Sequence, residues 1–162
     1  MRQVVEELKN ILNEELAIYR RILELGKSKG KLLVEKFSSE LQNIVSLEEQ
    51  LVQQLVDLEP RRKDCVGILT GDPEAKLDSV TDQVAESDGK SDLWIISDNL
   101  LSVIEEIKKV NDTNQRLVEQ ALELTQYSIK LITRAPKPVT YGPGGKSSSQ
   151  LPQSRSLINR KA

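Results

Sequence analysis

Histidine is absent from the 162-residue chain, and cysteine occurs once, at Cys65. Histidine is the commonest general base and metal ligand in proteins, so its absence removes most acid–base and metal chemistry. A single cysteine forms no intramolecular disulfide and, without a histidine to activate it, is expected to be a small apolar helix residue. No acidic loop matches an EF-hand, and no Gly-rich loop has the strand–loop–helix context that cradles a phosphate. The sequence therefore predicts no enzyme, no metal site and no cofactor.

Aromatic residues are scarce, at 3% of the chain, and no apolar run approaches the roughly 20 residues of a membrane span. The first ten residues, MRQVVEELKN, are charged and lack the apolar core of a signal peptide. The expected location is therefore cytoplasmic, without stable membrane insertion. Compact α/β enzymes usually carry more rings, whereas Leu, Ile, Val, Glu, Lys and Gln dominate here, as is typical of long paired helices. The composition predicts an all-α fold.

Charge is distributed unevenly along the chain. The net charge is −2, but residues 135–162 contain five Lys or Arg residues and no acid, which leaves −7 for residues 1–134. Such an acidic body repels phosphate, so no nucleic-acid partner is expected there. Residues 135–162 are rich in Pro, Gly and Ser, and they are predicted to form a disordered, flexible basic tail. Residues 1–134 are predicted to form an antiparallel α-helical bundle.

Residues 91–133 form the longest uninterrupted helical pattern. They contain no Gly or Pro, and their apolar residues recur every three or four positions, the period of one helix face. At 1.5 Å per residue such a helix spans about 65 Å, so it needs partners of similar length.

Two further long helices and a short one complete the predicted bundle. Gly26 and Gly30 each weaken the first helix by about 1 kcal/mol and can end it early. The second is expected to kink or restart before Pro60, because proline lacks the N–H and clashes with the preceding turn. Residues 75–85 form the short helix. Short links make the three long helices alternate in direction, which gives an elongated antiparallel bundle or coiled coil.

Five polar residues lie on an apolar stripe or face the stripe of a neighbouring helix. We call them the structural seam: Glu15, Glu48, Arg62, Asn111 and Asn114. Counting from the first link places Glu15 close to the level of Arg62, so we predict that these two pair or share water between helices. The same count places Asn114 near Glu48. An asparagine at such a position either fixes register and partner number or lies at the stripe edge in water, and the sequence leaves both interpretations open.

Several segments occur in a fixed order along the chain: EELAIYRRILEL at 14–25, LEEQL at 47–51, LEPRR at 58–62, NDTNQRLV at 111–118 and SLINRKA at 156–162. In this order and spacing they resemble the FlgN family of flagellar export chaperones. Pro60 departs from the family pattern. This departure bears only on whether the second helix is continuous. The resemblance implies a non-enzymatic chaperone that binds the C-terminal segments of hook–filament junction proteins. It would prevent their premature assembly and deliver them to the flagellar type III export apparatus.

A helical hairpin offers a groove for an amphipathic helix, and a tail with isolated apolar residues can fold onto a partner. We therefore expect partner-binding residues in the C-terminal half of the long helix and in the tail: Leu117, Leu124, Ile129, Leu131, Ile132, Tyr141, Leu157 and Ile158. For the five helical residues the alternative is that they belong to the core. A homo-oligomer in the absence of cargo is compatible with this function.

Two other functions fit parts of the pattern. A structural coiled-coil scaffold without export cargo would show cleaner heptads and higher-order oligomers, and it leaves the apolar tail residues unexplained. An adaptor that binds membranes or nucleic acid through the basic tail predicts binding that collapses with salt.

Overall fold

The computed structural model describes residues 1–35 and 38–134, which are almost entirely helical. Within these ranges there is no β-strand. The elements are α1 (Arg2–Glu35), α2 (Ser38–Thr70), α3 (Leu77–Gln83), the 3-10 turn η1 (Glu86–Asp88) and α4 (Lys90–Arg134). The all-α prediction, with three long helices and one short helix, is confirmed. The predicted tail, residues 135–162, lies outside the described residues.

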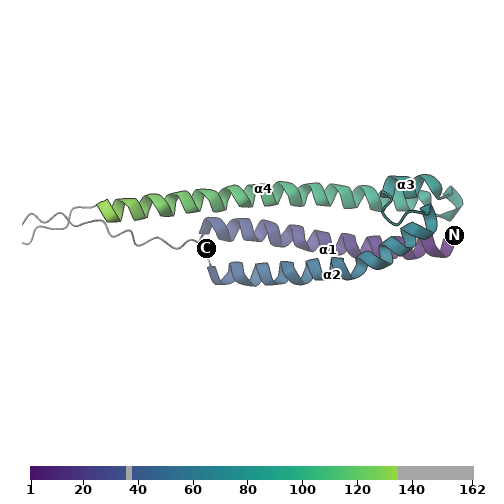
Figure 1. Cartoon of the computed structure of the whole chain (residues 1–162), viewed down its shortest axis with the longest axis horizontal. Coiled ribbons are helices and arrows are strands. Elements are labelled where there is room, and N and C mark those ends of the chain that lie inside the picture. Colours follow the sequence, from purple (N-terminus) through teal and green to yellow (C-terminus); the bar gives the residue numbers. More distant parts are fainter. Residues whose placement is uncertain (36–37, 135–162) are drawn as a thin grey trace, which may run out of the picture.

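The three long helices lie side by side, with α1 between α2 and α4 (Figure 1). α1 packs along both neighbours, whereas α2 and α4 make few contacts with each other over the described residues. α1 and α4 point in the same direction and α2 in the opposite one, as the short links predict. α3 and η1 close the end at which α1 begins, and at the other end α4 continues beyond α1 and α2.

The apolar core is densest at the end that α3 closes. Five side chains of α1 are at most 5% exposed: Val5, Leu8, Ile11, Leu12 and Leu16. They belong to one cluster with buried residues of the other helices, including Leu58, Val66, Val80, Leu93 and Leu100. The α1 set recurs every three or four residues, so one face of the helix is covered. Each fully buried side chain of this kind contributes about 1.5–3 kcal/mol, which makes this end the stable anchor of the bundle.

α1 and α2 both run through residues that weaken helices. α1 continues through Gly26 and Gly30, and α2 continues through Pro60. α1 therefore does not end early at the glycines. Of the two outcomes expected at Pro60, a kink or a restart, the restart does not occur. Figure 1 does show α2 changing direction in its second half, as an internal proline favours. Proline cannot donate a backbone hydrogen bond to the preceding turn. Burial of Leu58 and Val66, on either side of Pro60, offsets that loss of stability.

The two glycines allow α4 to approach α1 closely. A Cβ atom on Gly26 would lie 3.1 Å from Val110 Cγ1, and one on Gly30 would lie 2.6 Å from Asn114 Oδ1. Asn114 is only 6% exposed, and its Nδ2 donates a hydrogen bond of 2.8 Å to the carbonyl oxygen of Gly26. Asn114 thus lies inside the α1–α4 interface, where this bond favours one register, while Asn111 is exposed to solvent.

Candidate partner-binding surface

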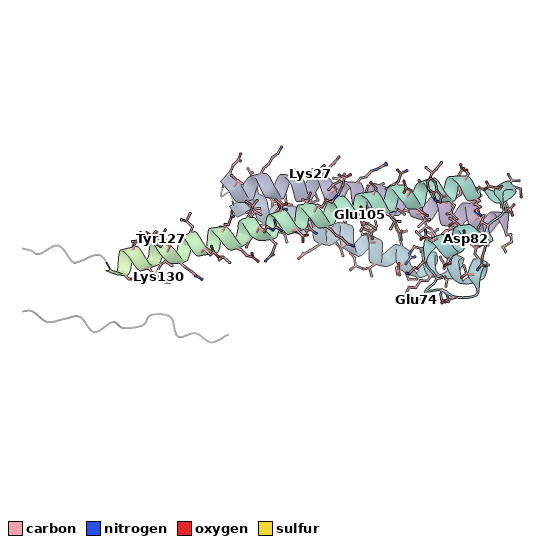
Figure 2. All side chains as sticks on the ribbon, turned by 90° about the horizontal axis from the view of Figure 1, so that it is seen from above. Lys27, Glu74, Asp82, Glu105, Tyr127 and Lys130 are labelled. Carbon is pink, nitrogen blue, oxygen red and sulfur yellow. The ribbon has the colours of Figure 1, made fainter. Side chains whose placement is uncertain are left out.

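α4 is longer than its partners, and we call its residues 121–134 the projecting end. Figure 2 places Tyr127 and Lys130 there, beyond the ends of the other helices. Every side chain from residue 121 to residue 133 is exposed. Six large apolar side chains of the projecting end are 44–76% exposed: Leu122, Leu124, Tyr127, Ile129, Leu131 and Ile132. Such a concentration of apolar side chains, on a helix that has no neighbour among the described residues, is typical of interaction surfaces.

The apolar stripe that packs α4 onto α1 continues onto the projecting end. Residues seven apart on a helix face nearly the same way, so Leu117, Leu124 and Leu131 prolong the stripe that includes Val110. Val34 lines the same hollow as Leu117, and α1 ends one residue after Val34. Within the described ranges, the stripe therefore has no covering helix beyond Leu117, although the sequence repeats the apolar position at Leu124 and Leu131.

The predicted partner-binding residues of α4 differ in position. Leu124, Leu131 and Ile132 are exposed on or beside the stripe. Ile129 is also exposed, but it precedes Leu131 by two residues and so lies about 160° away around the helix axis. Leu117 is half-buried. The alternative that these residues belong to the core is therefore wrong for the four exposed ones.

The sequence prediction omits two exposed residues of the projecting end, Leu122 and Tyr127. Tyr127 follows Leu124 by three residues and so lies beside it on the helix surface. That spacing was the available signal in the sequence. The remaining predicted partner-binding residues lie outside the described residues: Tyr141, Leu157 and Ile158.

Glu15 and Arg62 lie together between α1 and α2, at the level that the helix count predicts. Arg62 Nε lies 3.5 Å from Glu15 Oε1, and Arg62 also donates hydrogen bonds of 2.7–3.0 Å to the carboxylate of Glu59. Burial raises the pKa of the Glu15 carboxyl, while Arg62 opposes this shift and Glu59 adds to it. Glu15 is thus a buried carboxyl beside a cation that it shares with Glu59.

Asn114 and Glu48 lie at the same level of the bundle, as predicted, but each takes its partner from α1. Glu48 accepts hydrogen bonds of 2.8 and 3.0 Å from Lys29 Nζ. Asn114 donates to Gly26, less than one helical turn away from Lys29. In the described structure α1 therefore supplies the polar partner of each residue.

A second apolar surface, which the sequence prediction missed, lies between α2 and α4. This α2–α4 groove has a volume of about 720 Å³. Val52 and Val56 of α2 and Leu101 of α4 line it and are 50–57% exposed, while Glu15 and Tyr19 line it from α1. The groove exists because α1 holds α2 and α4 apart. Apolar residues on two faces of α2 were the signal for it.

A smaller hollow of about 410 Å³ adjoins the stripe where α1 ends. Its lining combines apolar Val34 and Leu117 with Lys27, Lys31 and Lys109. We call it the basic hollow. Three lysines around an apolar surface favour a segment that carries carboxylates beside its apolar residues.

The described ranges show no metal centre: no three His, Cys, Asp or Glu side chains are placed to hold an ion there. Cys65 is 4% exposed, and burial raises the pKa of its thiol, which keeps it in the unreactive protonated form. Within residues 1–35 and 38–134, no helix has both the length and the apolar character needed to span a bilayer.

Comparison with known proteins agrees with the helical architecture. The family model described as FlgN protein matches residues 1–149, which include every described helix. The chain is also similar to the Uncharacterized protein YvyG of Bacillus subtilis (strain 168), with 23% identity over 154 residues that cover 95% of this chain and 92% of that protein. No solved structure matches the chain. Because the family model spans nearly the whole sequence, the chain belongs to the FlgN family.

Proposed function

We propose that this protein is a cytoplasmic export chaperone for hook–filament junction proteins. It binds their C-terminal segments, prevents premature assembly and delivers them to the flagellar type III export apparatus. Membership of the FlgN family supports the general role of a flagellar chaperone. The observation that carries cargo binding is the apolar stripe of the projecting end, which has no partner in the described chain.

An amphipathic helix is the cargo that this surface fits. Leu124 and Leu131 continue the stripe that α1 covers in the preceding part of α4. An incoming helix can therefore take the place of α1 along the projecting end. Tyr127 adds an exposed ring beside the stripe, and aromatic side chains are common anchors of protein interfaces. Cargo subunits with amphipathic termini would be kept from self-association by this contact.

The basic hollow lies next in line along the stripe. Lys27, Lys31 and Lys109 line it, and Lys27 lies 3.9 Å from Glu106, a distance that leaves its ammonium group only loosely paired. A cargo helix with carboxylates near the end that reaches α1 would gain charge complementarity here. Salt is expected to weaken this contribution but not the apolar one.

Residues 135–162 are proposed to close over the bound cargo. Tyr141, Leu157 and Ile158 supply isolated apolar side chains in a segment that otherwise contains Pro, Gly, Ser and basic residues. A segment that orders only on binding gives modest affinity and ready release, which suits a chaperone that hands its cargo on.

Calorimetric titration with the C-terminal segment of a junction protein from the same organism tests the proposal. Leu131→Glu, on the stripe, is expected to weaken binding by about tenfold or more. Ile68→Glu on α2 is the matched control, since Ile68 is 64% exposed and far from the projecting end, and it should bind as the wild type does. A chain that ends at Ala135 measures the contribution of the tail.

Absence of heat with the wild-type chain would remove the cargo hypothesis and favour a structural scaffold. Equal binding by Leu131→Glu and Ile68→Glu would show that cargo, if bound, lies elsewhere than on the stripe. Circular dichroism of each variant verifies that the helices are intact.

A further inference from the structure

The α2–α4 groove is an apolar surface that no described part of the chain covers. Val52, Val56 and Leu101 on its walls are at least half exposed. Its volume of about 720 Å³ lies within the range of roughly 300–1,000 Å³ that is usual for binding pockets. We propose that residues 155–161 of the same chain, RSLINRK, occupy this groove. We call them the terminal segment; they lie outside the described residues.

The chain is long enough for the terminal segment to reach the groove. Ile104, which lines the groove, precedes Arg134 by 30 residues, a distance of about 45 Å along α4. Leu157 follows Arg134 by 23 residues, and an extended chain of that length spans about 75–83 Å. Tyr141 follows Arg134 by only seven residues and reaches about 25 Å at most, so it does not arrive at the groove. Length therefore selects the later part of the tail.

The groove has room for a further positive charge. Two carboxylates, Glu15 and Glu59, line it together with one cation, Arg62. Arg62 pairs with both of them, at 3.5 Å from Glu15 and 2.7 Å from Glu59. One cation shared by two carboxylates leaves an excess negative charge, which attracts a basic segment that also carries apolar side chains.

The terminal segment has both properties. Its adjacent apolar residues, Leu157 and Ile158, lie among three basic residues and no acid: Arg155, Arg160 and Lys161. Leu151 also lies far enough along the tail to reach the groove, but it has no charged residue within three positions. Charge therefore favours the terminal segment over the surroundings of Leu151.

The other exposed apolar surfaces of α4 suit a basic segment less well. The basic hollow presents three lysines and repels it. The projecting end carries two basic residues, Lys130 and Arg134, against one acid, Glu123. The groove is thus the apolar surface whose charge is opposite to that of the terminal segment.

The shape of the groove fits two neighbouring apolar side chains. Adjacent residues point in different directions in a helix and in an extended chain, so one of the pair can face the α2 wall while the other faces the α4 wall. α3 already packs against both α2 and α4, and its first residue, Leu77, lines the groove. The terminal segment would extend this covering over Val56 and Leu101.

A tethered segment needs only weak contacts to bind, because the tether fixes its effective concentration. The consequence for cargo rests on the proposed function. In the free chaperone the groove holds the terminal segment away from the stripe, and the segment leaves the groove when the tail closes over cargo. Docking therefore lowers the apparent affinity for cargo according to the fraction of chains in which the groove is filled.

Disulfide trapping in the full chain, without cargo, tests the contact. Ser156→Cys lies beside the apolar pair and leaves it intact, and Val56→Cys places the second thiol on the groove wall. Cys65 is 4% exposed, so it does not compete. With oxidised glutathione as the oxidant and a low protein concentration, the two introduced thiols should form a disulfide within one chain.

Val45→Cys with Ser156→Cys is the matched control. Val45 is 43% exposed and precedes Val56 by eleven residues, which places it on nearly the same face of α2, but it does not line the groove. It also lies nearer the end of the bundle from which α4 projects, so undirected encounters would favour the control (Figure 1). We expect the Val56→Cys pair to be trapped about tenfold or more faster.

Leu157→Ser combined with Ile158→Ser removes the apolar pair and should lower the trapping rate to that of the control. Three outcomes would each overturn the proposal: equal rates for the Val56→Cys and Val45→Cys pairs, a rate that survives loss of the apolar pair, and disulfides between two chains instead of within one. Circular dichroism verifies that each variant keeps its helices.

Calorimetry with the junction-protein segment tests the consequence for cargo. Val56→Glu prevents docking and should bind cargo up to about tenfold more tightly than the wild type. In a chain that ends at Ala135 the same substitution should change nothing, and equal binding by Val56→Glu and the wild type would contradict the coupling. Because trapping is measured without cargo, a wild type that gives no heat refutes the proposed function and leaves the groove contact standing.

Discussion

Replacing Gly30 with alanine tests the energetic role of the close approach between α1 and α4. In an unhindered helix this change stabilises by about 0.5–1 kcal/mol, because glycine loses more backbone entropy on folding. Here the new Cβ would lie 2.6 Å from Asn114 Oδ1, so the asparagine must move and its bond to the Gly26 carbonyl is lost. Leaving a buried amide without a partner costs about 1–3 kcal/mol. Gly30→Ala should therefore lower the free energy of unfolding by about 0.5–2 kcal/mol.

Gly67 provides a matched control within α2. A Cβ atom there would make ordinary contacts of 3.5–3.6 Å with Pro73. Gly67→Ala should therefore raise the free energy of unfolding by about 0.5–1 kcal/mol. Urea unfolding followed by circular dichroism measures both variants, and the opposite signs are the expected result.

A double-mutant cycle isolates the contribution of Asn114. In an Asn114→Ala background the obstacle is gone, so Gly30→Ala should become stabilising by about 0.5–1 kcal/mol. The reasoning is refuted if Gly30→Ala stabilises the wild-type chain as Gly67→Ala does. It is also refuted if the cost of Gly30→Ala is the same with and without Asn114.

Two further predictions concern buried titratable groups. Because burial raises the pKa of the Glu15 carboxyl above its ordinary value of 4.5, folding favours the protonated form, and this stability is present below that pH and lost as pH rises through the folded pKa. Glu15→Gln should therefore stabilise the fold in urea unfolding at pH 7 and change little near pH 4, whereas destabilisation at pH 7 would mean that the pair with Arg62 outweighs burial. Cys65 should react with a thiol reagent only as fast as the chain unfolds, and rapid labelling of the native protein would contradict its burial.

Local and periodic features of the fold were predictable from the sequence. The helices follow from apolar residues at intervals of three and four, a property of each segment alone. The pairing of Glu15 with Arg62 followed from the fixed rise of a helix and the short link between α1 and α2. Both inferences needed no knowledge of how side chains pack.

The glycines show where local reasoning failed. Helix propensity treats Gly26 and Gly30 as weak points, but in the bundle they are the places where α4 comes closest to α1. Their neighbours Val110 and Asn114 are more than 80 residues away in the sequence, so no local signal connects them. Packing with α4 stabilises this part of α1 and overrides the propensity.

The sequence by itself determined which residues are helical, which face of each helix is apolar, and the direction of the three long helices. Only the tertiary structure decided which apolar residues are covered. Leu117 and Leu124 occupy equivalent positions of one stripe, yet Leu117 is half-buried and Leu124 is 56% exposed. The physical reason is that periodicity describes one helix, whereas burial depends on where the neighbouring helix ends, and α1 ends between them.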